Sequence, residues 1–527
     1  MESGDQPTIG KLEIALFVAA GKGYDSIVQL LLDTPDVLLD CRDEDGRSPL
    51  SLAAQGGHEK VLSLLLSKGD VDVNSRDTKF SQTPICWAAK SGQAGAVSRL
   101  LECKDVDPNA TDSDGHTPLY WAVESGSAQV ALQLLKGNAD PSIKSAKGQS
   151  PLLWASQKGY DEIVALLIGS GKANVDDGDA GGHTPLWWAA QNGNLPTVQV
   201  LVRHGANLER RPFADVDGVK NDEYGTPLYQ AGRRGQYDVV KYLAKKGANV
   251  DSPSGKLGVP LLQTLVINDR SKRGMKMLHL LLRKGAEVNV KGRSGKTTLH
   301  IAAEDGDVEL TSLFLEMGAT VDEPTGDGLT PLHQAVLHNH EGIADILLSR
   351  EADIEAPTEA GNCPLHLAVL NDNRRMVDLL LDCEADVNAT NHLGETPLHM
   401  AAENGSRRMV DFLLGRGAND AIDAQDDYGR TALHRAVLVK SHHTMRLLVN
   451  RHADLSLTDM HGQTALHMAA KAGLKNDVHF LLSHGASVDI KDNDGNTVQD
   501  VTSKAGQSEI EKLLSTMSLV VPGESTE

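Results

Sequence analysis

The chain has 527 residues, a formal net charge of −21 and 4% aromatic residues. Negative charge on this scale argues against the phosphate backbone of nucleic acid as the main partner. No run reaches the roughly 18 apolar residues that a membrane helix needs, and the five cysteines form no C-x-x-C pair for zinc or redox work. We therefore expect a protein without membrane insertion in a reducing compartment, the cytoplasm, with a nuclear location left open.

A four-residue motif recurs along the chain at intervals of about 33 residues. Its clearest copies are Thr330-Pro331-Leu332-His333 and Thr396-Pro397-Leu398-His399, and degenerate copies bring the number of repeats to about fifteen. Repeats of this length cannot bury an apolar face alone and are stabilised by their neighbours. The period therefore predicts one elongated array in place of several globular domains.

Each repeat predicts two short helices. In the repeat that starts at Thr396, the threonine caps the first helix and Pro397 takes the position where a missing N–H costs nothing. Asn404-Gly405 ends this helix, and a second one through residues 409–414 ends at Gly415-Arg416-Gly417. Asp-x-x-Gly segments then predict a projecting turn, here called the finger, which leads into the next repeat.

The motif is similar to the ankyrin signature T-P-L-H-x-A, which identifies the chain by resemblance as an ankyrin repeat protein. The run Thr184-Pro185-Leu186-Trp187-Trp188-Ala189-Ala190 resembles a tryptophan-rich variant found in large fungal ankyrin proteins. The resemblance implies an all-α solenoid of about fifteen helix-turn-helix units with projecting β-turn or hairpin fingers, curved into a superhelix. It also implies a scaffold or adaptor that binds other proteins.

Spacing and charge divide the chain into five segments. We expect a disordered N-terminus at 1–11, repeats with a tryptophan ladder at 12–209, irregular basic repeats with two insertions at 210–296, regular repeats with a cap at 297–515, and a disordered tail at 516–527. The terminal repeats should have polar outer faces. We expect a monomer.

All five tryptophans lie between residues 87 and 188. Counting the Thr or Ser that opens each motif as position zero, four of them occupy position four, which points about 150° away from the Leu and Ala core stripe. These rings should line the concave face, where they either bind a partner or stack the repeats on one another. The candidate contact residues, which include aromatic residues at position three, are Trp87, Tyr120, Trp121, Trp154, Trp187, Trp188 and Tyr229.

The insertions fall at 210–224 and around Asn268 to Gly274, inside a segment of opposite charge. Residues 203–296 hold 19 Lys and Arg against 9 Asp and Glu. This segment could bind a phosphorylated or otherwise anionic ligand, or it could pair with the acidic ends of the same chain. The candidate anion-binding residues are Arg210, Arg211, Arg233, Arg234, Arg270, Lys272 and Arg273.

Six repeats carry histidine at position three. Because these residues belong to successive repeats, they do not converge on one metal ion. The resemblance to the ankyrin family implies instead that each is a hydrogen-bonding strut between helix and turn. The six histidines are His300, His333, His366, His399, His434 and His467. We find no nucleophile with a base at a recognisable spacing, and we expect no catalytic residue, no metal site and no cofactor. Acidic fingers such as Asp112-Ser113-Asp114-Gly115 favour partners with basic or amphipathic segments.

Overall fold

The computed structural model describes residues 10–35, 37–213, 225–252, 259–269, 271–292 and 294–517. Most of the first insertion and Arg270 lie outside these ranges. The described residues form 30 α-helices, one short 3₁₀ helix at Ala418–Ala421 and no β-strand. The helices make fifteen pairs, which confirms the expected number of repeats and the all-α class.

The first helices of the pairs are α1 (Lys11–Lys22), α3 (Pro49–Gly56), α5 (Pro84–Lys90), α7 (Pro118–Glu124), α9 (Pro151–Lys158), α11 (Pro185–Asn192), α13 (Pro227–Arg233), α15 (Leu261–Asn268), α17 (Thr298–Asp305), α19 (Pro331–Leu337), α21 (Pro364–Leu370), α23 (Pro397–Glu403), α25 (Ala432–Leu438), α27 (Ala465–Lys471) and α29 (Val498–Lys504). In thirteen of the fifteen pairs the first helix starts directly after position zero; the exceptions are α1, which follows Gly10, and α15, which follows Pro260.

The second helices are antiparallel to the first. They are α2 (Asp25–Leu32), α4 (Glu59–Leu66), α6 (Ala94–Leu101), α8 (Ala128–Lys136), α10 (Asp161–Gly169), α12 (Leu195–Arg203), α14 (Tyr237–Lys245), α16 (Lys272–Arg283), α18 (Val308–Glu316), α20 (Glu341–Leu348), α22 (Arg374–Asp382), α24 (Arg407–Gly415), α26 (His442–Asn450), α28 (Lys475–Ser483) and α30 (Ser508–Met517).

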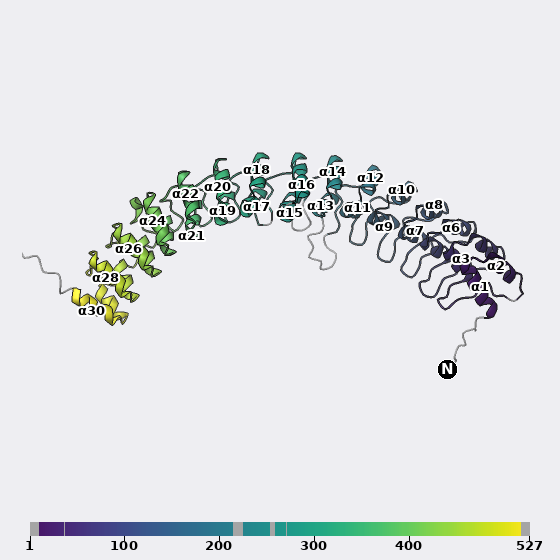
Figure 1. The fold of residues 1–527 in the computed structure, drawn as a ribbon, viewed down its shortest axis with the longest axis horizontal. Helices are drawn as coiled ribbons and strands as arrows, with labels where there is room; N and C mark the ends of the chain where they lie inside the picture. The colour runs from purple at the N-terminus through teal and green to yellow at the C-terminus, as the bar shows by residue number, and fades with distance from the viewer. Residues whose placement is uncertain are drawn as a thin grey trace, which may run out of the picture. The chain divides into compact units, whose positions relative to one another are not determined.

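The chain separates into two units, Met1–Glu287 and Val288–Glu527. Within each unit, first helices pack on first helices and second helices on second helices, so the helices form two rows (Figure 1). Alanines such as Ala88 and Ala89 are fully buried between neighbouring first helices, and leucines such as Leu100 fill the space behind them. No helix in the described ranges is long and apolar enough to cross a membrane.

The helix cap predicted in the repeat of Thr396 is present. The hydroxyl of Thr396 accepts the backbone N–H of His399, and Pro397 occupies the first turn. The finger glycines adopt the left-handed conformation, as at Gly115 with φ 77°. A Cβ atom there would lie 2.9 Å from the backbone nitrogen of Ala146 in the next finger, so glycine also permits close stacking of the fingers.

Two expectations about irregular repeats are wrong. The extra residues expected between helices near Asn268 partly extend the second helix, because α16 has 12 residues where α14 and α18 have nine each. The first repeat does not have a polar outer face. Ile27 is 45% exposed and Leu30 is 70% exposed, although Val61, which stands at the position of Ile27 in the next repeat, is buried. The last repeat is polar outside, as expected.

Candidate functional site

Four indoles form a row along the first unit. Trp87, Trp121, Trp154 and Trp188 stand at position four of α5, α7, α9 and α11, and each is half-buried. They are therefore outside the core of their own repeats, as the helical angle predicted. We call these four residues the tryptophan row.

Carboxylates fix the orientation of the row. The Nε1–H of Trp87 donates to Asp77 Oδ2 at 3.1 Å, that of Trp121 to Asp112 Oδ2 at 3.0 Å, and that of Trp188 to Asp179 Oδ2 at 3.2 Å, each acceptor lying in the finger just before the helix. In the repeat of Trp154, a serine replaces this aspartate. Its indole instead donates to Glu124 of the preceding repeat.

The same aspartates build the fingers. Asp112 is buried, and its Oδ1 atom accepts the backbone N–H groups of Asp114 and His116 at 3.0 and 2.8 Å. The first acid of this finger therefore does not attract basic partners as expected, because its oxygens are used inside the repeat. Asp114, two residues later, is exposed.

Three of the candidate contact residues are buried at position three. Tyr120, Trp187 and Tyr229 are 7%, 4% and 3% exposed. Trp187 Nε1 donates to the carbonyl of Gly225, 38 residues further on, and the Tyr229 hydroxyl lies 3.0 Å from Thr264 Oγ1. The prediction that they contact a partner is wrong, because the next repeat covers position three.

Tyr120 shows how such a residue joins two repeats. Its ring stacks on His116 of its own finger, with centroids 4.0 Å apart, and on Trp154 of the next repeat, with centroids 5.8 Å apart. Burial raises the pKa of the Tyr120 hydroxyl to about 12, and the nearby carboxylates of Glu124 and Asp112 add to the effect. Tyr120 therefore supports the row from behind.

Lysine ammonium groups lie over the half-buried indoles of the row. Lys90 Nζ is 4.1 Å from the ring centroid of Trp121, 5.2 Å from that of Trp87 and 5.4 Å from that of Phe80. Lys158 Nζ is 4.8 Å from the ring of Trp154. All four distances are typical of cation–π contacts. Sequence reasoning missed these lysines, although Lys90 stands one helical turn after Trp87.

In the second unit, position four has a different environment. The residues that replace the tryptophans there are mixed in chemistry, and Gln334, Leu367, Met400 and Met468 are buried. Arg435 is buried too, and its guanidinium donates to Asp426 Oδ2 at 2.6 Å, to Glu395 and to Glu403. Exposed rings at position four are therefore a feature of the first unit.

Five of the six position-three histidines have the expected strut geometry, whereas Nε2 of the sixth, His467, is buried without a hydrogen-bond partner among the described residues. The backbone N–H of Thr330 donates to His333 Nδ1 at 3.1 Å, so the proton is on Nε2, which lies 3.3 Å from the carbonyl of Asn362 in the next repeat. Burial of the ring lowers the pKa of His333 to about 4, and it lowers the pKa of the other five as well. These residues are neutral at pH 7.

The candidate anion-binding residues do not form one cluster. Arg233 and Arg234 end α13, and Lys272 and Arg273 begin α16 in the following repeat, so these four exposed residues share the edge where first helices turn into second helices. Residues 210 and 211 follow α12 on the opposite edge, among the fingers. Arg270 lies outside the described residues.

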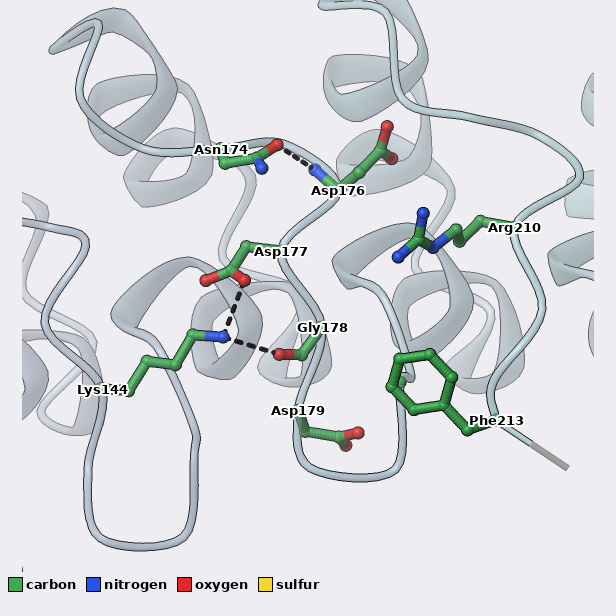
Figure 2. Close-up of a pocket in the computed structure, with 9 residues that line it drawn as sticks. Lys144, Asn174, Asp176, Asp177, Gly178, Asp179, Arg210 and Phe213 are labelled. Atoms are coloured by element: carbon green, nitrogen blue, oxygen red, sulfur yellow. Dashed lines mark hydrogen bonds and ion pairs between the residues drawn. The ribbon is translucent and has the colours of Figure 1, made fainter. Parts of the chain in front are cut away.

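Arg210 lines a polar cavity between fingers, with a volume of about 300 Å³. Its side chain enters from the segment after α12, while Lys144 enters from the other side and donates to Asp177 Oδ1 at 2.7 Å and to the carbonyl of Gly178 at 3.0 Å (Figure 2). The carboxylates outnumber the cations, so the cavity does not favour an anion. Its lining residues are Lys144, Asn174, Asp176, Asp177, Gly178, Asp179, Gly182, Arg210 and Phe213.

Comparison with known proteins gives one family. The family model described as ankyrin repeats (3 copies) matches residues 4–77, 70–145, 129–212, 152–254, 269–358, 365–459, 416–494 and 441–517. Among solved structures, the ankyrin repeat domain of Bcl-3, described as a unique member of the IkappaB protein family, is 30% identical over 41% of this chain and 99% of that one, with a TM-score of 0.38. No curated protein matches. The chain belongs to the ankyrin repeat family.

Proposed function

We propose that the protein is a non-catalytic scaffold or adaptor that binds an extended segment of another protein along the tryptophan row. Ankyrin repeats generally mediate protein–protein interaction, and the family is typically non-catalytic. One observation carries the proposal. Position four is buried in most repeats of the second unit, whereas in four consecutive repeats of the first unit it holds a half-exposed indole fixed by a carboxylate.

The geometry supports binding in two ways. Successive indoles belong to neighbouring first helices, which pack about 8–10 Å apart, and an extended peptide covers this distance with about three residues. The hydrogen bonds from Trp121 to Asp112 and from Trp188 to Asp179 hold the rings in place before a partner arrives. A partner therefore loses little free energy to ordering of the surface, and each covered ring can contribute about 2 kcal/mol.

Replacing Trp121 and Trp154 together by Ala is expected to weaken binding of a partner by about 2–4 kcal/mol, which is at least about thirtyfold. The full chain and the double variant are used to capture proteins from a native lysate, and the dissociation constant of each protein that depends on the row is then measured with purified components. The capture experiment identifies the partner, and the titration gives the loss.

The matched control is the double replacement by Phe, which keeps an aromatic face but removes the indole N–H bonds to Asp112 and Glu124. It should lose stability without losing most of the affinity. If the Ala variant unfolds at a lower temperature but captures the same proteins equally well, the row only packs the repeats and the proposed function is wrong.

The alternative function is an anion-binding module on the basic segment. The four basic residues that share one edge support it, since Lys272 and Arg273 extend this edge from Arg233 and Arg234. Phosphoinositide vesicles or phosphopeptide arrays should then bind the protein, and the binding should fall when Lys272 and Arg273 are replaced by Glu or when salt is raised. Arg374 and Arg375 open α22 at the same place in the second unit and provide the matched control. Equal loss in both variants would show non-specific attraction.

The cytoplasmic location and the monomeric state stay predictions from the sequence. Sedimentation of the purified full chain would test the second of them.

A further inference from the structure

Three rings surround one ammonium group in the first unit. Lys90 Nζ lies between the faces of Phe80, Trp87 and Trp121, which come from one finger and two successive first helices. The rings are partly open to solvent, and Phe80 is 38% exposed. We call this group of four residues the Lys90 site.

The ammonium of Lys90 has no acidic partner in the described part of the chain. No carboxylate lies within 4.0 Å of it, and the same holds for Lys79, whose Nζ is 5.4 Å from the Phe80 ring. Arg47, which faces Trp87 from the preceding repeat, is paired with Asp43 at 2.9 Å and adds little net charge. Two lysines without a carboxylate within 4.0 Å therefore lie near the Phe80 ring, in a chain whose net charge is −21.

The aspartates that hold Trp87 and Trp121 already have hydrogen-bond partners within their own fingers. Asp77 is buried, with Oδ1 accepting the backbone N–H groups of Lys79 and Phe80 and Oδ2 accepting those of Gln82 and the Trp87 indole. Asp112 likewise receives the Trp121 indole and the backbone of its own finger. Neither side chain can turn to Lys90 without breaking the finger that holds the indole.

We propose that the Lys90 site receives an Asp or Glu side chain of the bound segment, with a neighbouring apolar side chain of that segment against the open indole faces. This proposal rests on the proposed function and names the chemistry of the partner at this site. An incoming carboxylate pairs with Lys90 while the ammonium group keeps its rings, and Lys79 adds positive charge beside Phe80, so recognition needs no rearrangement. The partner segment is therefore acidic and apolar at this point, in contrast to the basic partner expected from the finger sequences.

The opposite possibility is that a cationic side chain of the partner displaces Lys90 and takes its place among the rings. The two cases respond with opposite signs to Lys90→Glu. Reversal of the charge repels a carboxylate and weakens an acidic partner, whereas it places a counter-ion beside an aromatic surface and tightens a cationic one.

The test uses the full chain and a displayed library of random 12-residue peptides. Peptides are selected on the native protein. Their dissociation constants are then measured by fluorescence anisotropy for the native protein and for three variants, which are Lys90→Glu, Lys90→Met and the Trp121→Ala, Trp154→Ala double variant. Lys136→Glu is the matched control, since Lys136 is an exposed lysine in the last turn of α8, a second helix.

We expect enrichment of Asp and Glu beside apolar residues in the selected peptides. Their binding to Lys90→Glu should be about tenfold weaker, with a smaller loss of affinity for Lys90→Met and no change for Lys136→Glu.

Enrichment of Lys and Arg with tighter binding to Lys90→Glu would overturn the proposal. Binding that depends on the tryptophans but not on Lys90 would also overturn it and leave the proposed function standing. If no selected peptide depends on the tryptophans, both are wrong. Circular dichroism of each variant confirms folding, and Lys79→Glu serves if Lys90→Glu does not fold.

Discussion

Lowering the pH from about 6.5 to about 4 is expected to unfold the second unit while the first unit keeps its fold. The six strut histidines all lie in the second unit, beginning at His300. Position three of the first unit holds other residue types, among them Ser51, Leu153 and Trp187. A repeat array can lose one part of its structure before another, because each repeat contacts only its neighbours.

The direction in which the free energy of unfolding changes with pH follows from the lowered pKa of the histidines. An unfolded histidine takes up a proton near pH 6.5, whereas burial lowers the pKa of folded His333 to about 4. Between these values the unfolded state binds more protons, so the contribution of His333 to the free energy of unfolding decreases as the pH falls and changes no further below about 4. For His333 alone the loss is about 3 kcal/mol. The other five histidines shift in the same direction and act on the same unit.

Two spectroscopic signals separate the units. All five tryptophans are in the first unit, so their fluorescence reports on that unit alone, whereas far-ultraviolet circular dichroism reports on all helices. The second unit holds 14 of the 30 described helices. On acidification, close to half of the helical signal should disappear while tryptophan emission is unchanged. A simultaneous change of both signals would contradict selective unfolding, and His333→Leu should remove part of the pH dependence at that repeat.

The replacement Arg435→Met is expected to destabilise the second unit by about 3–5 kcal/mol at pH 7. The Arg435 guanidinium is buried and contacts the carboxylates of Asp426, Glu395 and Glu403. Methionine has a similar length and apolar character, but it leaves the negative charges of Glu395 and Glu403 without their cation and leaves Asp426 with Arg430 as its partner at 3.0 Å. The cost comes from those charges and from the buried Asp426 above all, since it is fully enclosed.

This effect should decrease in acid. Burial by itself would raise the pKa of Glu395 and Asp426, but hydrogen bonds, from Asn391 and Arg435 to Glu395 and from Arg435 and the Arg430 backbone to Asp426, outweigh it and lower both pKa values. Their stabilising contribution is present above about pH 4 and is lost as the carboxylates take up protons at lower pH. Urea unfolding of both proteins at pH 7, followed by circular dichroism, measures the difference.

Arg451→Met is the matched control. Arg451 forms an exposed ion pair with Asp411 at 2.6 Å in the same unit, and such pairs contribute less than about 1 kcal/mol. If the two replacements destabilise the protein equally, the buried network around Arg435 contributes no more than an exposed pair. In that case the contact of Arg435 with Asp426 would not stabilise the repeat in the way that the indole contacts with finger aspartates do at the same position in the first unit.

The sequence by itself determined the repeat, its two helices and the residues that cap them. Thr396 and Pro397 act through contacts within one turn of helix, and the strut histidine follows its threonine by three residues, so a local pattern was sufficient. The 33-residue spacing gave fifteen pairs for the same reason. It also placed Trp121 outside the core, because the angle between positions on a helix does not depend on the neighbours.

Only the tertiary structure decided which side chains remain accessible. Tyr120, Trp187 and Tyr229 are buried by the repeat that follows them, about 30 to 40 residues away in the chain. The sequence assigned the finger aspartates to tight turns, and only the structure shows that the indole N–H groups of Trp87, Trp121 and Trp188 also donate to them. The ammonium group of Lys90 contacts the ring of Trp121, which belongs to the next repeat, so the sequence around Lys90 does not reveal this contact. Burial and pairing of this kind depend on contacts between repeats, and periodicity within one repeat carries no information about them.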